Sequence, residues 1–194
     1  MRRTGGRDGG YTARLIASGG AAPAGLARRL GASLYEALML AALLLGLSFV
    51  LLPLVTPAAL APGAAPADAS PSLYLPSPGA RGWSGAVLFA ACGAYCIGLW
   101  SGGRRTLPMK TWRLALATAT GHTVAPRRAA WRFVAWWIGP ALAVAGYMAL
   151  QPLGLGRWAL PLLAVNYAWA LVDRERQFLH DRVAGTRLIV PAAA

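Results

Sequence analysis

The chain has 194 residues, of which 57% are hydrophobic and only 13% are charged, and it carries a formal net charge of +13. Soluble domains contain about 45–50% apolar and about 25% charged residues, so this composition argues against a soluble globular protein. The excess positive charge fits nucleic-acid binding in principle. Here the basic residues are gathered in particular loops, which is typical of membrane topology. We therefore expect membrane lipids, and not nucleic acid, to be the partner of these charges.

The predicted elements begin with residues 1–22, a basic segment that we expect to be a disordered cytoplasmic N-terminus. A membrane domain follows over residues 23–190. A membrane-spanning helix needs roughly 20 apolar residues. Four segments approach that length, at about residues 31–54, 83–100, 133–150 and 153–172. The fourth is the weakest because Gly154, Gly156 and Arg157 interrupt its start.

Two internal signals concern how these segments pack. Pro140 lacks the N–H that would bond to the carbonyl of Trp136, so it predicts a kink in the third segment. Small residues also recur every four positions in the second and third segments, a spacing that lets helices approach closely in lipid. Alanine is abundant throughout the chain, so such a stripe is also expected by chance. The two stripes are Ala86, Ala90, Ala94, Gly98 and Ala135, Gly139, Ala143.

Loop charges predict the orientation. Residues 1–29 contain six arginines and one acid, and residues 101–132 contain seven basic residues and no acid. Residues 55–82, by contrast, contain one arginine and one acid. Because positively charged loops stay in the cytoplasm, both termini and the 101–132 loop are predicted to be cytoplasmic. The 55–82 loop and the short 151–157 loop are predicted to be external.

The cytoplasmic segments contain further predicted structure. Apolar and small or basic residues alternate over residues 112–116, and residues 187–190 contain β-branched and other apolar residues, so these pieces are predicted to pair as strands. Residues 173–185 are predicted to form an amphipathic helix on the inner membrane surface, with Asp173 as its N-cap and Gly185 at its end. Its apolar face would consist of Phe178, Leu179 and Val183. The expected fold class is an all-α membrane protein with four transmembrane helices, a short amphipathic C-terminal helix and a small cytoplasmic β-pairing.

Glu36 is the acidic residue that stands inside a long apolar run. A charged side chain in hydrocarbon costs about 2.5–3.5 kcal/mol by insertion measurements, so it needs compensation. Arg29 precedes it by seven residues and lies on the same helix face, about two turns away. One interpretation is a polar site open to the cytoplasm, with Glu36 as an ion or proton ligand. The alternative is a structural tether in which Glu36 accepts hydrogen bonds from Arg132, Arg182 or a helix N-terminus.

His180 and Asp181 form a second polar pair near the predicted inner surface, and Asp173 is a further polar candidate there. A histidine titrates near neutral pH, but a His–Asp pair without a nucleophile or metal partners favours interfacial hydrogen bonding over catalysis. Asn166 and Tyr167 are expected to hydrogen-bond across helices. The sequence contains no phosphate-binding glycine loop, HExxH motif or Cys/His cluster, so we expect no enzyme activity, no metal and no cofactor.

Three blocks resemble the RDD family of bacterial membrane proteins. They are RRLGASLYE at residues 28–36, TLPMK at residues 106–110, and the segment of residues 172–190 that contains DRERQFLHDRVAGTR. In the resemblance, Arg29 matches the family's arginine, Glu36 stands for an aspartate, and Asp181 matches the family's other aspartate. Pro108 departs from the family's glycine.

The resemblance implies a small multi-pass protein of the bacterial inner membrane, with transport, including cation/proton exchange, proposed for some members. Our main hypothesis is a structural or interaction component whose cytoplasmic-side polar cluster contains Arg29, Glu36 and Asp181. Its expected partners are anionic lipids of the inner leaflet, and a second copy or another membrane protein. The alternative is a small oligomeric transporter that uses Glu36 as its coupling carboxylate.

Overall fold

The computed structural model describes residues 22–55 and 76–191. The predicted disordered N-terminus, apart from Ala22, and most of the predicted external loop therefore lie outside the described residues. The chain forms two compact units. One contains the described parts of Met1–Glu36 and Tyr95–Ala194, and the other contains those of Ala37–Ala94.

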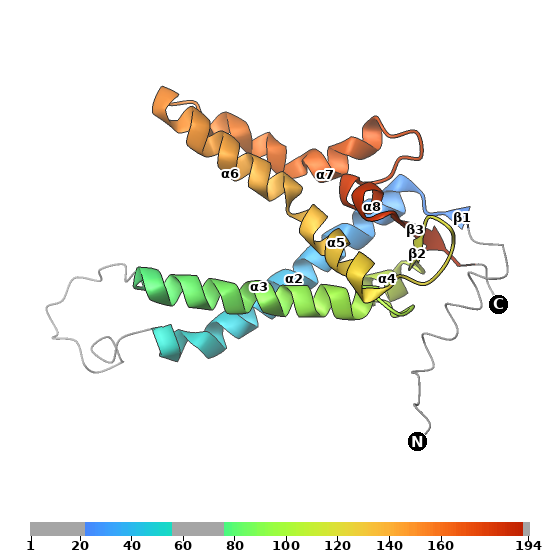
Figure 1. Cartoon of the computed structure of the whole chain (residues 1–194), viewed down its shortest axis with the longest axis horizontal. Helices are drawn as coiled ribbons and strands as arrows, with labels where there is room; N and C mark the ends of the chain where they lie inside the picture. Colours follow the sequence, from blue (N-terminus) through green and yellow to red (C-terminus); the bar gives the residue numbers. More distant parts are fainter. Residues whose placement is uncertain (1–21, 56–75, 192–194) are drawn as a thin grey trace, which may run out of the picture. The chain divides into compact units, whose positions relative to one another are not determined.

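Long apolar helices dominate the chain (Figure 1). Helix α2 covers Leu26–Val55, α3 covers Pro78–Trp100, and α5 (Pro126–Trp136) is followed directly by α6 (Ile138–Leu150). Within the described ranges, three helical stretches are long and apolar enough to cross a membrane: Leu26–Val55, Pro78–Trp100 and Pro126–Leu153. These contain the first three predicted spans, and each begins several residues earlier than predicted.

The fourth predicted span is not one helix. It consists of the 3₁₀ segments η2 (Gln151–Leu153) and η3 (Gly156–Ala164), the short helix α7 (Val165–Ala168) and a last 3₁₀ turn, η4 (Trp169–Leu171). Gly154 adopts a left-handed φ of 69°, and Pro161 interrupts the backbone donors of η3. The structure therefore does not confirm a fourth transmembrane helix.

This irregular segment nevertheless packs closely along α6, as Figure 1 shows. A Cβ atom at Gly139 would lie 2.8 Å from the carbonyl oxygen of Leu163, and one at Gly146 would lie 3.0 Å from the Cβ of Ala159. Ala135, Gly139 and Ala143 are all buried, so the predicted stripe in the third segment is a packing surface. In the second segment the predicted stripe fails, because Ala86, Ala90 and Ala94 are exposed.

The predicted kink lies close to its expected position. The helix is interrupted at Trp137, between α5 and α6, three residues before Pro140. Pro140 leaves the carbonyl of Trp136 without its helical donor. The side-chain amide of Asn166 donates to this carbonyl at 2.7 Å and so replaces the missing backbone bond.

The cytoplasmic strand pairing is present, and it is larger than predicted. Strand β3 (Thr186–Val190) lies in the middle of a three-stranded antiparallel sheet, with β2 (Ala115–Thr118) on one side and the two-residue β1 (Ala22–Pro23) on the other. In the register, Leu116 faces Leu188. The strand begins later in the loop than predicted because the short helix α4 (Leu107–Thr111) and its C-cap Trp112 precede it.

The predicted helix of residues 173–185 is much shorter in the structure. Helix α8 covers only Leu179–Ala184 and ends, as predicted, at Gly185, whose φ is 61°. Asp173 does not cap this helix; its Oδ2 accepts the backbone N–H groups of Glu175 and Gln177 and closes a turn before it. Phe178 is fully buried whereas Val183 is 54% exposed, so the predicted apolar face does not exist as a single surface. Helix α8 packs instead on α5 and β3.

Candidate functional site

A buried ion pair joins α5 to α8. Arg132 Nε donates to Asp181 Oδ1 at 2.7 Å, and both side chains are buried. Thr186 at the start of β3 also donates to Asp181 Oδ1, at 3.2 Å. On its other face, the Arg132 guanidinium lies 4.1 Å from the ring centre of Trp100, which is a close cation–π contact. Arg132 therefore connects α5 with both α8 and the end of α3.

Asp181 is ionised in this setting. Burial alone would raise its pKa, but the adjacent Arg132 charge and the hydrogen bonds from Arg132 and Thr186 hold the pKa below its usual value. A buried carboxylate with a charged and hydrogen-bonded partner is the arrangement that proteins tolerate. The pair thus holds α5 and α8 at one fixed distance.

His180 is buried next to this pair in the uncharged state. Burial lowers the pKa of His180 to about 4, with Asp181 opposing the shift and Arg132 adding to it. Its Nε2 lies 3.4 Å from Arg132 Nη2, so Nε2 accepts and the proton resides on Nδ1. The 3.8 Å separation between His180 Nε2 and Asp181 Oδ2 is then a polar contact and not an ion pair. The His180 ring also meets the Tyr167 ring edge-on and lies tilted against the Phe178 ring.

Glu36 has a partner that the sequence analysis did not propose. Its Oε2 accepts a hydrogen bond from the hydroxyl of Thr106 at 2.9 Å, and both side chains are buried. Thr106 is the N-cap of α4, and the same oxygen accepts the backbone N–H of Met109. One hydroxyl therefore caps the N-terminus of α4 and binds α2. Neither Arg132 nor Arg182 forms a hydrogen bond or ion pair with Glu36 in the described part of the chain.

Arg29 does not meet Glu36. Its side chain is buried, and its guanidinium carbon lies 5.5 Å from the ring centre of Phe178, just before α8. Asp181 and Asp173 are the acids whose charges act on it most. Arg29 therefore joins the start of α2 to the C-terminal segment. Glu36 lies about two turns further along α2 and joins this helix to α4.

Asp173 and Arg182 lie apart from the buried cluster. Arg182 is 55% exposed and lies 3.8 Å from Asp173 Oδ1 and 3.4 Å from Glu175 Oε2. The Arg182–Glu175 pair is exposed on both sides, and exposed pairs contribute about 0–1 kcal/mol. These two candidates organise the surface turn before α8 and have no place in the core of the site.

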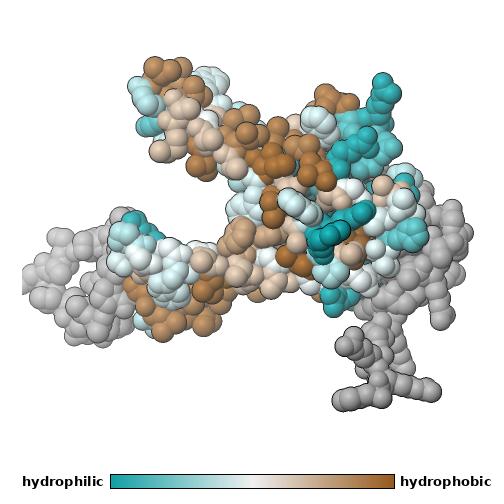
Figure 2. All heavy atoms as spheres, in the orientation of Figure 1, coloured by the Kyte–Doolittle hydropathy of each residue, from teal (hydrophilic) through white to brown (hydrophobic). Residues whose placement is uncertain are grey.

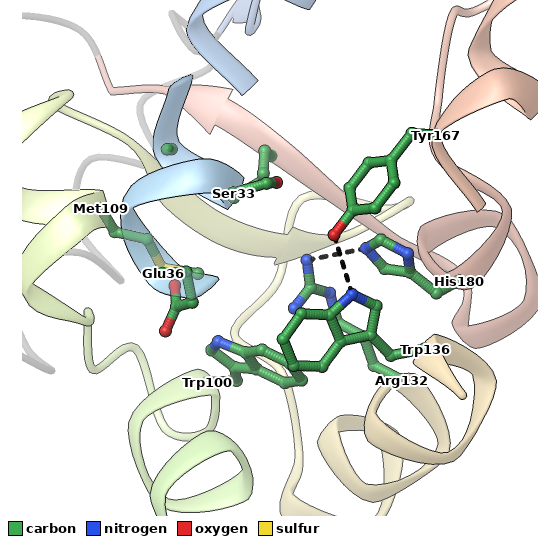
Figure 3. A pocket seen from close by; sticks show the side chains of 10 residues that line it. Ser33, Glu36, Trp100, Met109, Arg132, Trp136, Tyr167 and His180 are labelled. Atoms are coloured by element: carbon green, nitrogen blue, oxygen red, sulfur yellow. Dashed lines mark hydrogen bonds between the residues drawn. The ribbon is translucent and has the colours of Figure 1, made fainter. Parts of the chain in front are cut away.

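A small cavity separates the two polar contacts (Figure 3). Its volume is about 20 Å³, which suffices for about one water molecule. In Figure 3, Arg132, Trp136, Tyr167 and His180 gather on one side of it, and Glu36 and Met109 lie on the other. Buried atoms without a hydrogen-bond partner in this region include Glu36 Oε1, Trp100 Nε1, His180 Nδ1 and Asp181 Oδ2. No cluster of three or more His, Cys, Asp or Glu side chains suited to a metal ion occurs in residues 22–55 and 76–191.

Sequence reasoning missed several members of this region. Thr106 gave a readable signal, because Thr–Leu–Pro is a typical N-cap followed by proline in the first helical turn. Trp100 ends the second predicted span; it is buried and also meets Trp136 edge-on at 6.0 Å. Nothing in the local sequence identifies it as the cation–π partner of an arginine 32 positions later.

In a comparison with protein families, the RDD family matches residues 23–185. A search of curated proteins and a search of solved structures each found no match to this chain. The matched range contains all three apolar helical stretches and the Arg29, Glu36 and Asp181 positions on which the resemblance was based. The chain belongs to the RDD family and is a membrane protein.

Proposed function

We propose that this protein is a structural or interaction component of the membrane, without enzyme activity, whose buried polar cluster holds its cytoplasmic-side elements together. The observation that carries the proposal is the buried Arg132–Asp181 contact of 2.7 Å. The Glu36–Thr106 bond repeats the arrangement between α2 and α4. In both, a carboxylate is bound by a side chain of the same chain.

The topology in this proposal has four membrane passes, with both termini in the cytoplasm of a bacterial inner membrane. The seven basic residues of the 101–132 loop support this orientation. The close packing of η3 on α6 supports a fourth pass made by an irregular segment, because irregular backbone is tolerated at membrane depth where protein covers it. Labelling of Ser72→Cys by a membrane-impermeant maleimide from outside the cell tests the orientation, and protection from the outside would contradict it.

Partners in this proposal are membrane lipids and a second copy or another membrane protein. Large apolar side chains remain exposed along the described helices, for example Leu34 on α2, Val144 on α6 and Leu160 on η3. Such surfaces suit lipid or a neighbouring transmembrane helix. Crosslinking in native membranes, followed by identification of the adduct masses, tests whether a protein neighbour exists.

A second candidate function is a small oligomeric transporter or cation/proton exchanger. It is favoured by the unpartnered Glu36 Oε1 and by the water-sized cavity that Glu36 lines. A proton or a hydrated ligand would bind at that oxygen. Because the cavity holds about one water molecule, this function needs a path formed between copies of the chain.

One experiment separates the two functions. Wild type and Glu36→Gln are compared for ion flux in proteoliposomes and for melting temperature in detergent, with Thr106→Val as the matched variant that removes the same bond from the other side. The tether predicts similar melting losses in both variants and no wild-type flux above empty liposomes under proton, sodium or potassium gradients. Wild-type flux that Glu36→Gln abolishes at an unchanged melting temperature would overturn the tether.

A further inference from the structure

A basic groove lies outside the buried cluster, at the start of α5. Its volume is about 400 Å³, and the arginines Arg127, Arg128 and Arg182 line it together with Trp131, Val183 and the turn at Gly185. No acidic side chain is among the described residues that line it. Figure 2 shows hydrophilic and hydrophobic side chains mixed over α5 and mostly hydrophobic ones over α6.

The three guanidinium groups differ in how they are held. Arg128 Nη1 donates to the carbonyl of Gly185 at 3.3 Å, which fixes this side chain along the groove. Arg182 forms ion-pair contacts with Asp173 and Glu175, which do not line the groove. Arg127 has no acid within ion-pair distance among the described residues, so its charge is left for a ligand. A planar guanidinium presents donors that match phosphate oxygens in pairs.

Two further observations identify the class of ligand. The groove lies at the first turn of α5, where the apolar stretch Pro126–Leu153 begins, so it is placed at a membrane surface. Trp131 is 61% exposed beside the arginines, and exposed tryptophan favours the headgroup region of a bilayer. Helix α5 also begins without a side-chain cap, so the positive end of its dipole faces the same region.

We propose that this groove binds the phosphate of an anionic phospholipid headgroup, through Arg127, Arg128 and Arg182, with Trp131 alongside the upper acyl region. This site is separate from the Glu36 and Asp181 contacts and does not depend on the tether. It assigns a defined lipid position to the general attraction between basic loops and the inner leaflet.

The test measures lipid binding to the full-length protein in a neutral detergent. Phosphatidylglycerol and phosphatidylcholine are titrated at equal mole fractions, and the melting temperature reports the bound fraction. The groove variant carries Arg127→Gln, Arg128→Gln and Arg182→Gln. The matched control loses the same charge at three exposed arginines outside the groove, through Arg113→Gln, Arg174→Gln and Arg176→Gln.

The expected result is preferential binding of phosphatidylglycerol that weakens about tenfold or more in the groove variant, corresponding to 1.4 kcal/mol or more, and less than about twofold in the control. Equal losses in both variants would show a diffuse charge effect and overturn the site. Equal binding of the two lipids to wild type would also overturn it. So would full competition by millimolar inorganic phosphate, which would indicate a free-phosphate site.

If the triple variant does not fold, the wild type still tests the inference. The preference for phosphatidylglycerol must fall as sodium chloride rises from 50 to 300 mM, because salt screens contacts at an exposed groove. A preference that does not change over this range would refute binding by the arginines. In this arm, the single variant Arg127→Gln must also lower the preference, since Arg127 is the unpaired member.

Discussion

Removing the charge of Asp181 should destabilise the protein far more than removing a surface charge a few residues away. Asp181→Asn keeps the shape of the side chain but leaves Arg132 buried without a counter-charge, in contact with the Trp100 ring and with His180 Nε2. Breaking one side of a buried pair costs about 3–5 kcal/mol, because the remaining charge is left without a counter-charge. For a chain of this size, a loss of that kind lowers the melting temperature by roughly 6–20 °C.

The matched control is Glu175→Gln, which removes an acid from the exposed contact with Arg182 at 3.4 Å. Exposed pairs contribute about 0–1 kcal/mol, so this variant should melt within a few degrees of wild type. A thiol-reactive dye provides the assay, because the two cysteines of the chain, Cys92 and Cys96, are both buried and react once the fold opens.

A double variant completes the cycle. Arg132→Met combined with Asp181→Asn leaves no unpaired buried charge, so it should lose less stability than the sum of the two single variants. Losses that add, or an Asp181→Asn variant that melts like Glu175→Gln, would refute the view that this contact is a buried, coupled ion pair.

Three further predictions concern neighbouring contacts and use the same melting assay. The pKa of His180 is about 4 in the folded state and about 6.5 in the unfolded state, so the free energy of unfolding should fall as the pH drops through this window, by about 2 kcal/mol at pH 5. His180→Gln should flatten this pH dependence. An equally steep dependence in the variant would contradict a buried neutral imidazole. Thr106→Val should lower the free energy of unfolding by about 1–3 kcal/mol, because the hydrogen bond to Glu36 is lost. Thr106→Ser keeps the hydroxyl and should retain most of that stability. Equal losses in the two variants would show that the hydroxyl is not responsible. Asn166→Leu should cost about 1–3 kcal/mol because it leaves the Trp136 carbonyl unpaired, and a neutral result would mean that another donor replaces the amide.

The apolar helices were predictable because hydropathy acts over a whole segment. The first three spans, the strand pairing of β2 with β3 and the end of α8 at Gly185 follow from composition, alternation and a left-handed glycine. The prediction of a fourth transmembrane helix rested on hydropathy, which does not register how Pro161 and the glycines at the start of the segment weaken helical backbone hydrogen bonds. The helix predicted from Asp173 failed because its carboxylate binds the N–H groups of a turn equally well.

The polar residues were predictable as a set, but their partners were not. Arg29, Glu36 and Asp181 are all buried in the same compact unit. The apolar run around Glu36 and the resemblance to the family had singled them out. The spacing of Arg29 and Glu36 on one helix suggested a shared site, whereas Phe178 and Thr106 are the groups that they contact. Such contacts depend on how loops return to the helices, and a single sequence carries no direct record of that.

The amide of Asn166 has a consequence for membrane insertion. In the proposed four-pass topology, neither of the last two passes would enter lipid easily alone. The third would carry a Trp136 carbonyl without a hydrogen-bond donor, and the fourth an Asn166 side-chain amide without an acceptor. Each unsatisfied polar group in hydrocarbon costs several kcal/mol. Paired, the Asn166 NH2 group and the Trp136 carbonyl satisfy each other. The last two passes would then leave the translocon together, already paired as a helical hairpin. Among related sequences, substitutions at Pro140 and Asn166 should therefore occur together.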